Sequence, residues 1–243
     1  MIGLLRAVRQ YPRRAPLTFA YVILLFAGHI VVKNWLHPET EAELYRYIST
    51  NLENLQDHPI TTLFGSLLFF DGTLTPDLSD SDSVLYFVGT FFTLGLGVCC
   101  FLAWAESRWG TLRAYAMFIG AHVVTTLVVA VVIVVALENS WYPPEVRQST
   151  DYGISYGAQA VSALGILALP LWARIPWGLW VLTSPLIGLT WVGPLPDFST
   201  IGHILAAIFG FALAAVLTSA QRRARIAARA SDEAHHSASS SLT

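Results

Sequence analysis

The chain has 243 residues, of which 54% are hydrophobic and 12% charged, and its formal net charge is −2. Soluble globular domains carry about 25% charged residues, so this composition excludes an ordinary soluble enzyme. The high apolar content also excludes a disordered or collagen-like chain. The composition therefore predicts an integral membrane protein whose main surroundings are the lipid bilayer, with no nucleic-acid partner.

Six stretches are long and apolar enough to cross a membrane, because a spanning helix needs about 20 mostly apolar residues. They cover residues 17–36, 84–105, 114–137, 153–173, 175–196 and 198–221. A seventh apolar stretch, residues 59–70, is too short to span and is expected to be interfacial or re-entrant. The sequence thus predicts an all-α membrane protein with a six-helix membrane domain over residues 17–221.

The basic residues predict the orientation of this domain. Eleven of the 14 Lys and Arg residues fall in alternate connecting segments, which the positive-inside rule assigns to the cytoplasm. Both termini are then cytoplasmic, and this independently requires an even number of spans. Residues 1–16 form a basic N-terminal segment, and residues 222–243 form a tail that is basic and then disordered from Ser231 onward. The composition favours a bacterial plasma membrane.

A long outer loop, residues 37–83, separates the first two spans. Within it, residues 41–55 carry apolar side chains at helical spacing. This pattern predicts an amphipathic helix on the membrane surface, and a plain surface loop is the alternative.

Polar side chains inside the spans are the best indication of function, because they are costly in lipid. Ser155 lies at the outer end of the fourth span, and His203 lies at a similar depth in the sixth. A serine hydroxyl becomes a nucleophile when a base takes its proton, and histidine is suited to that near neutral pH. Gly153 and Gly157 allow close backbone approach, and free N–H groups at a helix start can stabilise an oxyanion. The alternative is that these glycines form a helix-packing motif that includes Ser155 only by position.

His122 lies near the middle of the third span, beside Thr125 and Thr126. It is either a buried histidine that is hydrogen-bonded between helices, or part of a hydrated cavity near Ser155 and His203. No second ligand lies at helical spacing from any histidine in the spans, so neither a metal ion nor another cofactor is expected.

This organisation resembles the rhomboid superfamily of six-span intramembrane serine proteases and their inactive relatives. The resemblance rests on the long outer loop and on three short motifs. The motif residues are Gly153 and Ser155 in the fourth span, Glu106 and Gly110 after the second, and Gly202, His203, Ala206 and Gly210 in the sixth.

The resemblance implies a catalytic dyad in which Ser155 attacks a peptide carbonyl and His203 is the general base. The backbone N–H of Ser155 would supply part of the oxyanion hole. The small residues of the sixth span would let it pack closely on the fourth, and Glu106 with Gly110 would form a structural turn. Substrates would be transmembrane segments of other proteins, cleaved near the outer membrane face.

Two departures from the family pattern keep a second function open. Tyr156 follows the serine directly, where the family usually has glycine, and the second span contains no Asn that could bind an oxyanion. Tyr156 is itself a candidate for the aromatic residue that stacks on the family's histidine. The alternative is an inactive rhomboid-like protein that binds membrane-protein clients. The sequence predicts no oligomeric state.

Overall fold

The computed structural model describes residues 9–70 and 72–240, with side chains up to residue 228. Four helical stretches in this part of the chain are long and apolar enough to cross a membrane: α2 (Pro16–Trp35), Ser81–Trp109, α8 (Thr111–Glu138) and Phe198–Ala228 within α11 (Phe198–Ser240). Each coincides with a predicted span. The stretch Ser81–Trp109 is continuous through α6 (Ser81–Thr90), the π-helix η2 (Phe91–Leu102) and α7 (Ala103–Trp109).

Two shorter helices occupy the region between α8 and α11. They are α9 (Ser155–Leu164), continued by η4 (Gly165–Leu167), and α10 (Leu171–Thr183), continued by η5 (Ser184–Leu186). The predicted spans, 153–173 and 175–196, place the break between these helices at residue 174, and this is wrong. The first helix ends at Leu167 and the second begins at Leu171. Pro170 precedes α10 in an extended conformation, which prevents a continuous helix there and starts α10 at Leu171.

The prediction that the fifth span is helical as far as residue 196 is also wrong, because the helix ends at Leu186. Gly188 and Gly193 have positive φ angles, and Gly193 joins β1 (Trp191–Val192) to β2 (Leu195–Pro196) in an antiparallel pair. A Cβ at Gly193 would lie 2.4 Å from the carbonyl oxygen of Trp141. The hairpin thus folds back over the end of α8. The average hydropathy of residues 175–196 does not reveal this turn.

The outer loop contains several short helices: α3 (Pro38–Ile48), α4 (Leu52–Asp57), α5 (Pro59–Gly65) and η1 (Ser66–Leu68). The predicted helix over residues 41–55 is interrupted because Asn51 caps α4, its side chain accepting a hydrogen bond from the N–H of Asn54 at 2.9 Å. The short apolar helix Pro59–Leu68 agrees with the predicted non-spanning element. A further helix, η3 (Pro144–Gln148), lies between α8 and α9.

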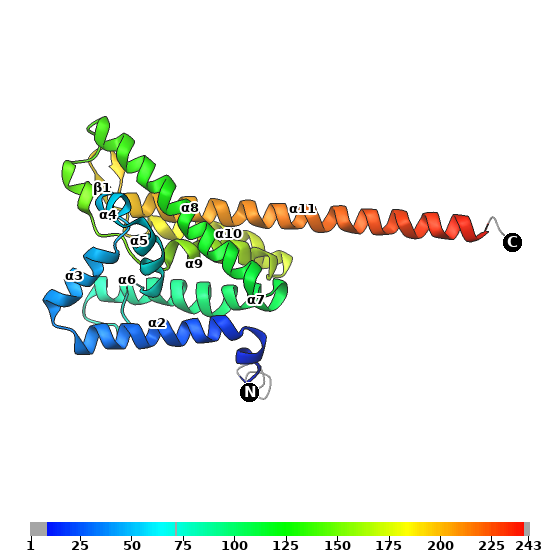
Figure 1. The fold of residues 1–243 in the computed structure, drawn as a ribbon, viewed down its shortest axis with the longest axis horizontal. Helices are drawn as coiled ribbons and strands as arrows, with labels where there is room; N and C mark the ends of the chain where they lie inside the picture. Colours follow the sequence, from blue (N-terminus) through cyan, green and yellow to red (C-terminus); the bar gives the residue numbers. More distant parts are fainter. Residues whose placement is uncertain (1–8, 71, 241–243) are drawn as a thin grey trace.

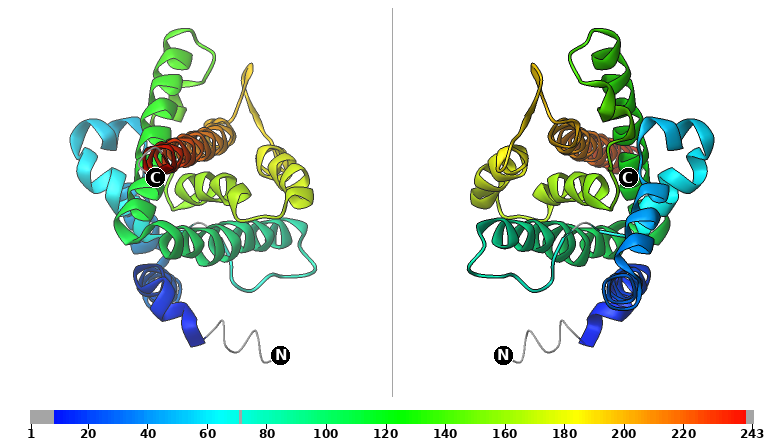
Figure 2. Two further views of the ribbon diagram at one scale, coloured as in Figure 1. Left: turned by 90° about the vertical axis from the view of Figure 1, so that its right-hand side faces the viewer. Right: turned by 90° about the vertical axis from the view of Figure 1, so that its left-hand side faces the viewer.

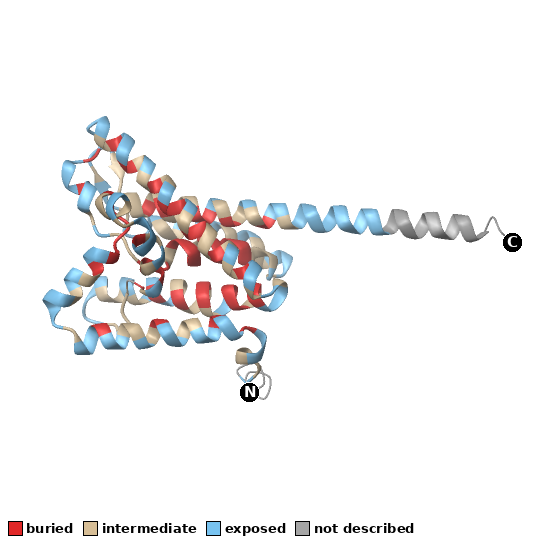
Figure 3. Ribbon diagram, viewed as in Figure 1, coloured by how far each residue is buried: buried red, intermediate tan, exposed pale blue. Residues whose placement is uncertain are grey.

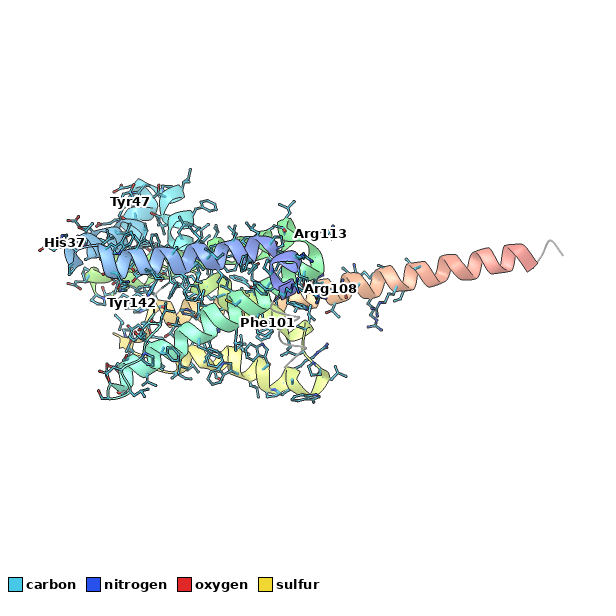
Figure 4. All side chains as sticks on the ribbon, turned by 90° about the horizontal axis from the view of Figure 1, so that it is seen from below. His37, Tyr47, Phe101, Arg108, Arg113 and Tyr142 are labelled. Atoms are coloured by element: carbon cyan, nitrogen blue, oxygen red, sulfur yellow. The ribbon has the colours of Figure 1, made fainter. Side chains whose placement is uncertain are left out.

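The two ends of the helical bundle carry different connections. Figure 4 places His37, Tyr47 and Tyr142 at one end and Arg108 and Arg113 at the other. Helix α2 begins at the Arg108 end, and α11 projects from the bundle at that same end (Figure 1). The connections that follow α2 and α8 thus lie at the end opposite to the connection between α7 and α8.

Helix α11 continues far beyond the packed part of the bundle. Residues 218–228 are all exposed (Figure 3), and the helix runs to Ser240. The expected disorder from Ser231 onward is therefore not found as far as Ser240, and residues 241–243 lie outside the described chain. Ala, Arg and Glu are strong helix formers, and extending an existing helix needs no new nucleation.

The centre of the bundle is α9. This helix packs against α11, η2, α8 and α10, and the end-on views of Figure 2 show it enclosed by them. Eight of its ten residues are buried, whereas helices on the outside bury only one side. The fold therefore places α9, the helix that begins with Ser155, among four other helices.

Candidate active site

Ser155 is the first residue of α9 and is partly exposed. The preceding Gly153 has a φ of +113°, a conformation that residues with a side chain rarely adopt. The buried Ile154 donates its N–H to the carbonyl oxygen of Phe69 at 3.1 Å, which holds the turn against the outer loop. Because the first N–H groups of a helix have no acceptor within it, the backbone around Ser155 offers hydrogen-bond donors.

His203 lies in the second turn of α11, and the chain fixes its tautomer. Its Nδ1 is 2.8 Å from the backbone carbonyl oxygen of Ser199. A carbonyl oxygen only accepts, so Nδ1 carries the proton in this contact. In the neutral imidazole, Nε2 then has the free lone pair that a general base requires. The hydroxyl of Ser199 lies 3.4 Å from the same Nδ1.

His203 borders a cavity of about 360 Å³ between α6, η2, η5 and the start of α11. Its apolar walls include Leu85, Phe92 and Trp180, and Gln159 of α9 reaches it together with Asp197. The Gln159 amide nitrogen donates to the carbonyl oxygen of Val181 at 2.6 Å, which ties α9 to α10. Ser155 itself is not among the residues that line this cavity.

Two glycines bring α9 and α11 into close contact. A Cβ at Gly202 would lie 2.5 Å from the Tyr156 ring, and one at Gly210 would lie 2.1 Å from the carbonyl oxygen of Ala160. Ala206, between them, is fully buried. The small residues of the sixth predicted span thus lie where α11 meets the helix that carries Ser155.

Tyr156 fills the space that Gly202 leaves. It is 2% exposed, and its ring meets the ring of His203 edge to face, with centroids 5.0 Å apart and an interplanar angle of 69°. An aromatic residue therefore contacts the histidine from the position directly after the serine. Gly157, one residue later, packs beneath Phe118, whose ring would lie 2.7 Å from a Cβ at that position.

His122 on α8 is buried beside this cluster. Its Nε2 lies 3.2 Å from the hydroxyl oxygen of Ser66 in η1, and its ring centroid is 6.3 Å from that of Tyr156. It therefore bridges α8 and the outer-loop element. Buried side-chain atoms without a hydrogen-bond partner in the described chain include His122 Nδ1 and the hydroxyls of Thr62, Thr125 and Thr126.

Glu106 is 3% exposed and accepts four hydrogen bonds. Three come from the start of α2: the N–H of Leu17 at 3.1 Å, and the N–H and hydroxyl of Thr18 at 2.8 and 2.7 Å. The fourth comes from the Thr111 hydroxyl at 2.7 Å, just after Gly110, whose φ is +84°. Glu106 is thus a structural acceptor that joins its own turn to a distant helix.

The structure brings Tyr156, Gly202 and His203 into contact but does not join the proposed pair, and Glu106 and Gly110 lie apart from them, beside the start of α2. Ser155 and His203 lie on adjacent helices, and no hydrogen bond connects them in the described part of the chain. Sequence analysis missed Asp151 and Ser199, which contact Tyr156 and His203. Ser199 could have been found, since it precedes His203 by one helical turn, whereas the contacts of Asp151 depend on the tertiary fold.

The sequence model of a family described as rhomboid-like protein matches residues 10–223. The chain belongs to the rhomboid-like protein family. The match covers three of the four membrane-length helices completely and the fourth as far as residue 223, and it includes Ser155 and His203. Neither a search of curated proteins nor one of solved structures gave a match. This rhomboid-like chain is therefore an integral membrane protein by its family and by its apolar helices.

Proposed function

We propose that this rhomboid-like protein is an intramembrane serine protease that cleaves transmembrane segments of other proteins, with Ser155 as nucleophile and His203 as general base. The observation that carries the proposal is the contact of 2.8 Å between His203 Nδ1 and the Ser199 carbonyl oxygen. The histidine Nδ1–H is held by this carbonyl oxygen, so Nε2 is the basic nitrogen, on a helix packed through Gly202 against the helix that Ser155 begins.

In the proposed reaction, Nε2 of His203 accepts the Ser155 proton as Oγ bonds to the substrate carbonyl carbon. The N–H of Ser155 donates to the developing oxyanion. The peptide C–N bond then breaks, and the proton passes to the leaving amine. A water molecule then loses a proton to Nε2 as its oxygen bonds to the acyl carbon. The bond between that carbon and Oγ breaks, and Nε2 returns the proton to Oγ, which releases the new carboxylic acid. Catalytic hydrogen bonds are often long in substrate-free proteins and shorten when substrate binds.

The proposal includes a six-span topology with both termini in the cytoplasm, in which α9 and α10 are the fourth and fifth spans. The site then lies near the outer face of a plasma membrane, and its substrate would be a locally unwound transmembrane segment. The basic residues near the Arg108 end of the bundle support this orientation.

The experiment compares proteolysis by matched variants. The full-length protein is reconstituted in liposomes with a membrane-protein extract, and new N-termini are mapped by mass spectrometry. The wild type should create N-termini inside transmembrane segments, and Ser155→Ala and His203→Ala should create none of them. Ser162→Ala, which removes another serine of α9, should cleave like the wild type. The same N-termini in all four samples, or none in any, would refute the proposal.

A second candidate is a protein that binds membrane-protein clients without cutting them. The position of Tyr156 directly after the serine favours it, as does the lack of a hydrogen bond between Ser155 and His203 in the described chain. This candidate predicts that the same clients crosslink to the wild type and to Ser155→Ala, without a cleavage product from either.

A further inference from the structure

Asp151, four residues before Ser155, connects the outer loop with the candidate active site. Its Oδ2 accepts hydrogen bonds from the Tyr156 hydroxyl at 3.0 Å and from the Thr50 hydroxyl at 3.1 Å. Hydrogen bonds to a carboxylate are stronger than those between neutral groups. The carboxylate is therefore a firm attachment for the Tyr156 hydroxyl.

The backbone of Asp151 is itself held by the segment between α3 and α4. Its N–H donates to the Ser49 hydroxyl oxygen at 2.7 Å, and its carbonyl oxygen accepts from the N–H of Thr50 at 2.5 Å. The same carbonyl oxygen shares the proton of the Thr50 hydroxyl, 2.9 Å away, with Oδ2. Ser49 and Thr50 are 0% and 6% exposed. Because these contacts are numerous and at least partly buried, the Asp151 carboxylate has a fixed place from which to act.

The other end of this arrangement is the ring of His203. Tyr156 is buried, its hydroxyl is bound by Asp151, and its ring contacts the imidazole with centroids 5.0 Å apart. Glycine is the only residue type that leaves room for the Tyr156 ring at position 202. A Cβ on Gly202 would lie 2.5 Å from the ring and from its hydroxyl. Ser199 holds Nδ1, so the backbone and Tyr156 together define the imidazole position.

We propose that Asp151 is a positioning residue: by binding the Tyr156 hydroxyl it holds the aromatic ring against His203 and so keeps the imidazole where a general base must lie. The catalytic part of this inference rests on the proposed function. The positional part concerns only the placement of a ring in the resting protein. A displacement of about 1 Å at a reacting group can lower a rate by about 100-fold, so a positioning residue can have a large effect.

The experiment observes the histidine ring and the serine separately. The full-length protein, with isotope-labelled histidine, is examined by NMR in detergent, and the His203 signal is identified by its loss in His203→Ala. Labelling of Ser155 by a fluorophosphonate probe is measured on the same samples. The variants are Asp151→Ala, Asp151→Asn and Tyr156→Phe, with the exposed Glu145→Ala as control.

Asp151→Ala should shift the His203 signal and lower the labelling rate by about tenfold or more. Asp151→Asn, whose amide oxygen can still accept from Tyr156, should retain most of both readouts, and Glu145→Ala should change neither. A purely structural anchor would not move the ring signal in a folded variant. Unchanged signal and labelling in Asp151→Ala would overturn the proposal.

Two further outcomes are also decisive. If Asp151→Ala loses its thermal unfolding transition, Tyr156→Phe decides, because it keeps the ring and removes only the hydroxyl; an unchanged His203 signal there overturns the inference. If the wild type is not labelled at all, the proposed protease function fails. A shifted His203 signal in the variants would then still support the positioning of the ring by Asp151.

Discussion

Glu106 stabilises the fold from a single position near the end of α7. Helix α2 has no side-chain cap of its own, and the N–H groups of its second and third residues, Leu17 and Thr18, donate to the Glu106 carboxylate instead. The negative charge also interacts favourably with the positive end of the α2 dipole. A contact between residues almost 90 positions apart thereby replaces the usual local cap.

Replacing this carboxylate should destabilise the protein strongly. Glu106→Ala leaves buried donors of α2 without an acceptor, and we expect the free energy of unfolding to fall by about 3 kcal/mol. Glu138→Ala, at an exposed acidic residue of α8, should change it by less than about 0.5 kcal/mol. Thermal unfolding followed by tryptophan fluorescence in detergent measures both. Equal midpoints for the two variants would contradict the structural role of Glu106.

At the scale of elements, the contact between α9 and α11 determines where the candidate catalytic residues meet. At Gly210 an added methyl group would approach the backbone of Ala160, which cannot move aside as a flexible side chain can. Gly120 on α8 provides a matched comparison, because a Cβ there meets nothing within 4 Å.

We therefore expect opposite effects from the same substitution at these two glycines. Gly210→Ala should lower the free energy of unfolding by about 1–3 kcal/mol and reduce proteolysis, because the two helices must separate. Gly120→Ala should leave stability unchanged or raise it by up to about 1 kcal/mol, because alanine favours a helix more than glycine does. The unfolding midpoints of the two variants test both predictions. A Gly210→Ala variant as stable and active as the wild type would contradict the close packing of α9 on α11.

The elements also show what the sequence can and cannot predict. The spans over residues 17–36 and 114–137 agree closely with α2 and α8, because a long apolar run has few alternatives to a membrane helix. The bounds 175–196 of the fifth predicted span are wrong, because the run stays apolar while Pro185 and the positive φ of Gly188 end the helix. Asp151 was missed because its partners lie about 100 positions away in the outer loop.

At the scale of the whole molecule, the topology is a specific prediction. Two residues that are each 84% exposed, Leu78 in the outer loop and Leu112 at the start of α8, should lie on opposite sides of the membrane. Leu171 and Trp191 mark the two ends of the α10 region in the same way, with 77% and 64% exposure.

Single cysteines at these four positions, in a Cys99→Ala and Cys100→Ala background, can be probed with a membrane-impermeant maleimide. In intact cells the positions of Leu78 and Trp191 should react, and those of Leu112 and Leu171 should react only after permeabilisation. This pattern requires that α9 and α10 both cross the membrane. Reaction of the Leu171 position in intact cells would contradict six spans with cytoplasmic termini.

The central claim is that His203 activates Ser155, and the most direct measurement is covalent labelling of that serine. The purified protein is treated with a fluorophosphonate, and the modified residue is identified by peptide mass spectrometry. The account predicts an adduct on Ser155 in the wild type and in Ser162→Ala, and its loss in His203→Ala although Ser155 is still present. An unmodified Ser155 in the folded wild type, or equal labelling without His203, would contradict the account.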